Sequence, residues 1–146
     1  MAHPFIEHLV EDHQKQRSIA EQLKDADESK VRDDLRTKMS DEVLPHMAGE
    51  EASIFAYMQR SDDEEAVKGA LEAMQEHHVA RLVLREIMDL GLDSEVFSAK
   101  AAVLSELNEH HMQEEEGGHF PWLEENASKE QMDGLFEKYE AAEEGA

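Results

Sequence analysis

A repeated segment constrains the fold of this chain more than any other feature of its sequence. The segment "HMAGEEASIFAYM", which begins at His46, aligns without gaps with "HMQEEEGGHFPWL", which begins at His111, at an offset of 65 residues. At an offset of 64, "EDHQKQR" aligns with "QEHHVAR", so that His13 matches His77. Each half of the chain therefore has one segment with a central His and one with H-x-x-x-E, a pattern typical of a duplicated helical hairpin.

Apolar residues recur at spacings of three and four in four stretches, and the whole chain of 146 residues has only three Pro and seven Gly. This period predicts helices over about 4–23, 30–59, 61–90 and 95–116, with a short fifth helix over about 128–142. We expect an all-α fold, an up-down-up-down four-helix bundle with a short C-terminal fifth helix. The length predicts one domain over 1–146, with its core over about 4–126.

Local signals predict where these helices begin and bend. Pro4 suits the first turn of a helix, and Pro45 is expected to kink the second helix just before His46. Gly117, Gly118 and Pro121 are expected to weaken the end of the fourth. The expected N-terminal caps are Ser61 paired with Glu64, Ser94, and Ser128 paired with Gln131.

The H-x-x-x-E spacing places an imidazole and a carboxylate on the same face of a helix. His46 with Glu50, and His111 with Glu115, lie on otherwise apolar stripes, as do the central His of the other two helices. Burying such carboxylates would be costly without neutralising cations, and no buried Lys is expected. The sequence therefore predicts two divalent cations. The candidate ligands are His13, His46, Glu50, His77, His111 and Glu115.

The donor types limit the metal. The chain has no Cys, which excludes disulfides and thiolate-bound metals. His and carboxylate donors suit iron or manganese and also admit zinc. Four His and two Glu give two His per ion, allow both Glu to bridge, and leave coordination positions for a small molecule. The alternative is that these groups are core polar residues that satisfy one another.

Several neighbouring residues allow more than one interpretation. Helical period does not separate His77 from His78 or His110 from His111, but the repeat selects His77 and His111. His3 with Glu7 and His110 with Glu114 have the same spacing off the main stripes, and we interpret them as surface coincidences. His119 and His8 lie about one turn from candidate ligands. His119 could be an additional ligand, a gate or a core residue.

Other residues near the predicted site have a structural interpretation. We interpret Arg17 and Arg81, four residues after the central His, as exposed ion-pairing residues, with a role in supporting the ligands as the alternative. The aromatic residues of the repeat are interpreted as core packing around one end of the bundle: Phe55, Tyr57, Phe120 and Trp122.

The net charge of −22 repels phosphate backbones and anionic lipid, so we expect no nucleic-acid or membrane partner. No stretch approaches the length of an apolar membrane span, and the N-terminus lacks the basic and apolar regions of a signal peptide. We therefore expect a cytoplasmic protein.

Taken together, "EDH" at His13, "HMAGEE", "QEH" and "HMQEEEGGHFPWL" resemble the hemerythrin-like (HHE cation-binding) domain family over nearly the whole chain. The resemblance implies a four-helix bundle that holds a non-haem di-iron centre. It implies that the six candidates above are iron ligands, with Glu50 and Glu115 as bridging carboxylates and an oxo or hydroxo bridge between the ions.

The resemblance departs from the oxygen-carrying hemerythrins in two places. Those proteins have a second His where this chain has Arg81, and an Asp where it has Glu116. Their asymmetric iron pair is not reproduced, so reversible oxygen carriage is not expected. The four-His, two-Glu set is instead similar to that of di-iron proteins implicated in repair of iron-sulfur centres.

We expect a di-iron protein that binds or reduces a small diatomic or peroxidic ligand: oxygen, nitric oxide or peroxide. Oxidase, peroxidase or reductase activity is compatible with this hypothesis, and whether the protein is an enzyme stays open, as does its redox partner. One alternative is an iron-donor or iron-sulfur repair protein. Another is an interaction module in which the metal only staples the bundle.

Overall fold

The computed structural model describes residues 2–146, and every regular element in that range is helical. The elements in chain order are α1 (Pro4–Asp25), α2 (Ser29–Glu50), the π-helical segment η1 (Glu51–Phe55), α3 (Ala56–Gln59), α4 (Glu64–Asp89), α5 (Phe97–Glu114), the π-helical segment η2 (Glu115–His119), α6 (Phe120–Asn126) and α7 (Lys129–Gly145).

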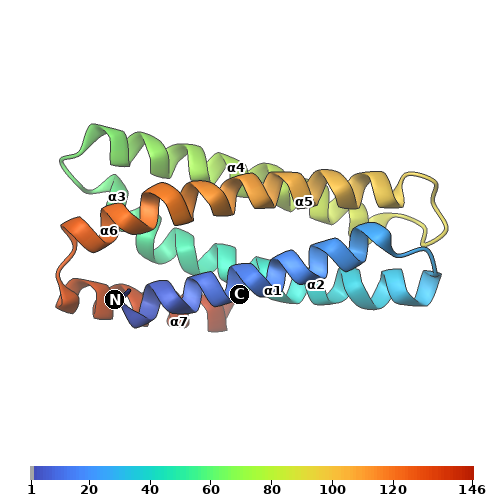
Figure 1. Cartoon of the computed structure of the whole chain (residues 1–146), viewed down its shortest axis with the longest axis horizontal. Coiled ribbons are helices and arrows are strands. Elements are labelled where there is room, and N and C mark those ends of the chain that lie inside the picture. The colour runs from blue at the N-terminus through green and yellow to red at the C-terminus, as the bar shows by residue number, and fades with distance from the viewer. Residues whose placement is uncertain (1) are drawn as a thin grey trace.

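The four long helices form the bundle that the sequence predicts. Helix α1 packs against α2 and α5, and α4 packs against the same two helices, so the four close a ring around one interior. Figure 1 shows them running alternately along the long axis. Helix α7 packs against α2 and η1 and runs back along the end of the bundle where α3 and α6 lie (Figure 1). The predicted bundle with a C-terminal fifth helix is confirmed.

Side-chain acceptors cap the first turns of α1, α4 and α7. At α7 the predicted capping box between Ser128 and Gln131 is present, and Pro4 starts α1. The predicted cap of α4 was wrong: Asp63 accepts from the backbone N–H of Glu65 and Ala66, while the Ser61 hydroxyl donates to the Met58 carbonyl at 2.7 Å. A carboxylate is a strong acceptor at a helix N-terminus and displaces the serine there.

The start of α5 also differs from the prediction. Ser94 belongs to a turn, closed by a 3.3 Å hydrogen bond from the Phe97 N–H to the Ser94 carbonyl, and the helix begins at Phe97. The residue that precedes this helix, Val96, makes no capping hydrogen bond through its side chain.

The chain stays helical at Pro45 and through Gly117 and Gly118. Helix α2 is continuous from Ser29 through Pro45 to Glu50. The repeat shows a π-helical segment at the end of each H-x-x-x-E: η1 begins directly after Glu50, and η2, which contains Gly117 and Gly118, begins at Glu115. Such wide turns inside helices are rare and frequently lie at functional sites.

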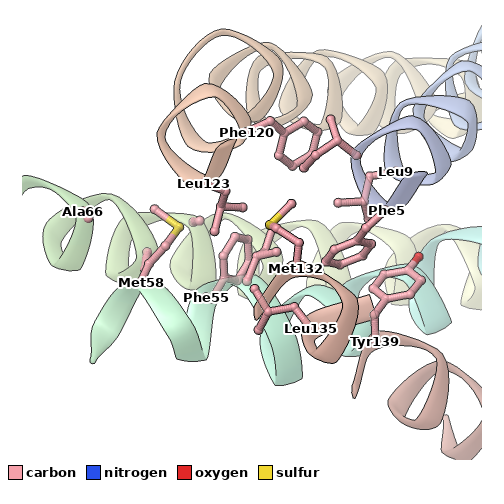
Figure 2. Close-up of a cluster of buried hydrophobic side chains, with 14 residues drawn as sticks. Phe5, Leu9, Phe55, Met58, Ala66, Phe120, Leu123, Met132, Leu135 and Tyr139 are labelled. Atoms are coloured by element: carbon pink, nitrogen blue, oxygen red, sulfur yellow. The ribbon is translucent and has the colours of Figure 1, made fainter. Parts of the chain in front are cut away.

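Two apolar clusters fill the interior on either side of the repeated His and Glu residues. The cluster near α3 and α6 is sealed by α7, and Figure 2 shows Phe55, Phe120 and Leu135 converging there. The other cluster occupies the far end and includes Leu23, Met39 and Leu104. Within residues 2–146, no helix is long and apolar enough to cross a membrane.

Candidate metal centre

The six predicted site residues meet in the middle of the bundle. Helix α1 supplies His13, α2 supplies His46 and Glu50, α4 supplies His77, α5 supplies His111, and Glu115 is the first residue of η2. All six residues are buried, with a relative exposure of 5% or less. Because the repeat places equivalent residues on diagonally related helices, these five elements can direct their polar groups at one region.

The Glu50 carboxylate lies between two pairs of imidazoles. Its Oε2 is 3.2 Å from Nε2 of His46 and 4.0 Å from Nε2 of His13. Its Oε1 is 3.1 Å from Nε2 of His77 and 3.6 Å from Nε2 of His111. Each carboxylate oxygen thus serves a different pair of His. One buried carboxylate shared in this way is the arrangement that a bridging ligand between two ions requires.

The Glu115 carboxylate is the second buried acid. Its Oε1 lies 3.2 Å from Nε2 of His13 and 3.3 Å from Nε2 of His111, and so reaches one His of each pair. Neither oxygen of Glu115 makes a hydrogen bond, and Glu50 Oε2 and His13 Nε2 are also buried without one. Such unpaired buried groups cost free energy unless something else satisfies them.

Each of the four imidazoles also makes a hydrogen bond on the side away from the centre, where its Nδ1 contacts a carboxylate. We call these four acids the outer carboxylates. The Nδ1–O distances are 2.6 Å for His13 to Glu116, 3.0 Å for His46 to Asp12, 2.8 Å for His77 to Glu51 and 2.7 Å for His111 to Glu76. These four acids obey the repeat: Glu51 corresponds to Glu116, and Asp12 to Glu76.

Two arginines hold one pair of the outer carboxylates. Arg81 donates to both oxygens of Glu51, at 2.6 and 3.0 Å. Its repeat mate Arg17 donates to both oxygens of Glu116 at 3.1 Å, and also to Glu109. Our interpretation of these arginines as exposed ion-pairing residues was incomplete, because the acids they pair with are those that hold His77 and His13.

The outer hydrogen bonds fix the imidazole tautomers. An Nδ1 that faces a carboxylate must carry a proton, so a neutral ring has its lone pair on Nε2, directed at the centre. The consequence is clearest for His77 and His111, whose Nε2 atoms lie 3.0 Å apart. Two lone pairs at that distance repel each other unless a proton or a metal cation lies between them.

The electrostatics of the buried groups lead to the same requirement. Burial disfavours an imidazolium, yet the carboxylates of Glu115 and Glu50 raise the pKa of His13 to about 9. Burial is likewise outweighed at His46, where Glu50 and Asp12 raise the pKa to about 10. Despite its burial, Glu50 has a pKa well below the usual range because of His46 and the other imidazoles. The site therefore attracts positive charge strongly.

The residues present fit divalent metal ions. Ligand atoms of His13, His46, Glu50 and Glu115 lie within 4.8 Å of one another, and so do those of Glu50, His77 and His111. Glu50 belongs to both groups. Buried charged side chains in residues 2–146 include no Lys or Arg that could neutralise the two acids. Imidazoles held by carboxylates are the usual support of metal-binding His.

The remaining histidines lie outside this centre. His78 is exposed on α4, His110 pairs with Glu114 at the surface, and His3 pairs with Asp133 at 2.7 Å. The repeat therefore selected the inward-facing His of each neighbouring pair.

His119 and His8, whose roles the sequence left open, also lie outside the group of six convergent residues. The buried Nε2 of His119 makes no hydrogen bond, and its ring lies 6.4 Å from that of Phe55. His8 lies 3.5 Å from Asp12, one of the outer carboxylates.

Aromatic rings cover the centre on the side of α3 and α6. Phe55 is fully buried, with its ring centroid 5.1 Å from that of His77, and Phe120 stacks on His13 at 5.7 Å. Tyr57 and Trp122 pack at the edge of the same cluster, as predicted for core residues. The rings limit the access of bulk water to the imidazoles.

Sequence reasoning did not assign a role to the outer carboxylates. Asp12 and Glu76 precede the central His, and Glu51 and Glu116 follow the Glu of H-x-x-x-E. The repeat could have identified these acids, because it aligns Asp12 with Glu76 and Glu51 with Glu116. A fifth residue that sequence reasoning missed, Tyr139 of α7, donates to Asp12 at 2.8 Å and has no counterpart in the repeat.

Comparison with known protein families identifies the chain's family. The sequence model of a family described as Hemerythrin HHE cation binding domain matches residues 5–123, which span α1 to α6 and include all six convergent residues. No curated protein and no solved structure matches the chain significantly.

Proposed function

The chain belongs to the hemerythrin HHE cation-binding family, and from that premise we propose that it holds two iron ions and binds or reduces a small diatomic or peroxidic ligand at them. The ligands of the ions are His13, His46, Glu50, His77, His111 and Glu115. The family and the buried His and Glu groups fit metal binding. The number of ions, their identity and the ligand are the proposed part.

One observation carries the proposal of two ions. The Glu50 carboxylate directs Oε2 toward His46 and Oε1 toward His77, at 3.2 and 3.1 Å. A single ion between two imidazoles would need one of these oxygens, whereas a pair of ions uses both. Glu115, which reaches His13 and His111, supports the same assignment as a second bridging acid.

The donor set favours iron. Each position has two imidazoles and one oxygen of Glu50, and two His with one carboxylate is the set typical of non-haem iron that keeps open coordination positions. The absence of Cys from the chain leaves no thiolate that would favour zinc or an iron-sulfur cluster. When bound, the iron pair supplies electrons and open coordination positions for a small ligand.

The protein supplies orientation and a water-poor environment. The outer carboxylates keep each Nε2 directed inward, and Arg17 and Arg81 fix two of those carboxylates. Phe55 and Phe120 pack against the imidazoles of His77 and His13, so that apolar rings close this side of the centre. A ligand is thus held near the ions with few competing waters.

The equal number of imidazoles at the two positions favours reduction of the ligand over reversible carriage. Arg81 donates to Glu51 instead of reaching the centre, so both positions have two imidazoles. Each position would therefore hold its ion through two imidazoles and a carboxylate, and an iron pair held in this way would supply electrons for reduction of a small ligand.

The test is stopped-flow mixing of the anaerobic, ferrous protein with oxygen, nitric oxide or hydrogen peroxide, followed by optical spectroscopy and iron analysis. We expect rapid oxidation of both irons with consumption of peroxide, and retention of both ions. A stable adduct that releases oxygen on degassing would instead assign carriage. Transfer of iron to an apo-acceptor would assign donation, and an inert metal whose removal only melts the bundle would overturn the proposal.

A further inference from the structure

The C-terminal helix contributes to one half of the centre only. Helix α7 lies outside residues 5–123, the stretch that the family shares, and it packs against α2 and η1. Figure 2 shows Tyr139 of α7 beside Phe5, with its hydroxyl directed out of the apolar cluster. The Tyr139 side chain is fully buried.

The Tyr139 hydroxyl closes a triangle of hydrogen bonds behind His46. It donates to Asp12 Oδ2 at 2.8 Å and accepts from His46 Nδ1 at 2.9 Å. The same Nδ1 lies 3.0 Å from Asp12 Oδ2. Burial and the Asp12 carboxylate raise the pKa of Tyr139, so the phenol keeps its proton and remains a donor. The triangle restrains both the carboxylate and the imidazole.

The backbone of α2 accommodates this contact through a glycine. A Cβ atom placed on Gly49 would lie 2.5 Å from two carbons of the Tyr139 ring, closer than van der Waals contact allows. Only Gly at this position lets α7 approach α2 closely enough for the hydroxyl to reach Asp12. Gly49 directly precedes Glu50 in α2.

The equivalent position in the other half has no such support. The counterpart of Asp12 is Glu76, which holds His111 at 2.7 Å with no phenol beside it. The Glu76 side chain is 26% exposed, against 7% for Asp12. Its neighbour is His110, which is mostly exposed, at 3.7 Å. Water can compete for Glu76 but not for Asp12.

We infer that Tyr139 makes the two metal positions inequivalent: the ion held by His13 and His46 binds more tightly, and the ion held by His77 and His111 is the exchangeable one. This inference rests on the proposed two-ion function. Tyr139 acts through Asp12 and His46 as a positioning residue, by holding the imidazole in its metal-binding orientation. Outer partners of this kind change metal affinity by about 10- to 100-fold.

The experiment measures stepwise binding of Mn²⁺, a redox-stable probe, by electron paramagnetic resonance and calorimetry. In the wild-type protein we expect two Mn²⁺ per chain that bind in two separable steps. Tyr139→Phe keeps the ring and removes the hydroxyl, and should weaken the tighter step about tenfold while leaving the other step unchanged. Tyr57→Phe is the matched control, since its hydroxyl makes only surface hydrogen bonds, of 3.3 and 3.5 Å.

Two backgrounds assign the affected position. In His111→Ala the metal position formed by His13 and His46 remains intact. Adding Tyr139→Phe to this variant should weaken Mn²⁺ binding at that position about tenfold. In His46→Ala the same addition should change nothing. An equal loss in both backgrounds, or no loss in either, would overturn the inference. Binding of fewer than two Mn²⁺ by the wild-type protein would instead refute the proposed two-ion centre.

Circular dichroism and thermal unfolding of each metal-free variant show whether it is folded. If Tyr139→Phe lowers the unfolding temperature but leaves the two binding steps as they are, Tyr139 has only a packing role and the inference fails. After loading with iron, the Mössbauer spectrum provides an independent readout. Two distinct quadrupole doublets are expected for the wild-type protein, and these should become more alike in Tyr139→Phe.

Discussion

Metal binding to this protein should release protons, and the number can be worked from the structure. Before metal binds, the carboxylates hold the pKa of His13 at about 9 and that of His46 at about 10. Both imidazoles are therefore protonated at neutral pH. The pKa of Glu50 lies well below its usual range, so this carboxylate is already ionised and contributes no proton.

An ion bound by His13 and His46 needs the lone pair of each Nε2, so it displaces about two protons at pH 7.5. The apparent affinity of this position should rise by about two decades per pH unit up to about pH 9 and by about one decade between pH 9 and pH 10, then level off. The pKa values of His77 and His111 are also raised, so the second ion should release protons as well.

The assay is calorimetric titration of the chelator-treated protein with Mn²⁺ in buffers that differ in ionisation enthalpy, which yields the protons released per ion. His110→Ala should leave the number unchanged, because His110 lies at the surface. Release of less than one proton per ion would refute the reasoning, since the ion would then not be displacing protons from the buried imidazoles.

Three further predictions follow from the same geometry. Glu50→Ala and Glu115→Ala should each lower metal occupancy, measured by elemental analysis, far more than His110→Ala, and equal losses would contradict the assignment of the site. Phe55→Ala should destabilise the protein by about 3–5 kcal/mol in denaturant unfolding, because it removes a fully buried ring; a change below about 1 kcal/mol would show that the ring is not a core residue. The metal-free protein should lose stability as pH rises from about 6.5 to about 10, since the raised pKa of His46 means that the folded state holds a proton the unfolded state releases; a free energy of unfolding that rises over this range would contradict it.

The bundle and the convergence of the six residues could be predicted because the repeat carries information that helical period alone lacks. His77 and His78 are adjacent, and only the match to His13 selects the first; in the structure His77 is buried and His78 is exposed. A duplicated hairpin requires equivalent residues to face one interior, so the fold and the convergence follow from one pattern. Their role as ligands remains a prediction.

The outer carboxylates escaped prediction because of the composition. In a chain with 36 Asp and Glu residues, an acid beside a candidate ligand looks like surface charge. Adjacent residues on a helix do not share a face, so Glu51 cannot serve the same ion as Glu50 by local geometry. It reaches His77 only because α4 packs beside η1. That contact depends on tertiary packing, which the sequence pattern did not give.

The sequence-based predictions missed three local features of the structure. Asp63 replaced Ser61 as the cap of α4. Gly117 and Gly118 were expected to weaken the helix, but they lie in the π-helical turn after Glu115. Tyr139 is separated from Asp12 by 127 residues, and no spacing rule connects residues so far apart.

Anomalous diffraction from crystals of the iron-loaded protein tests the central claim most directly. The proposed centre predicts two iron peaks in each chain, one between His13 and His46 and one between His77 and His111, with Glu50 contacting both. One peak, or six side chains that surround only water, would contradict it.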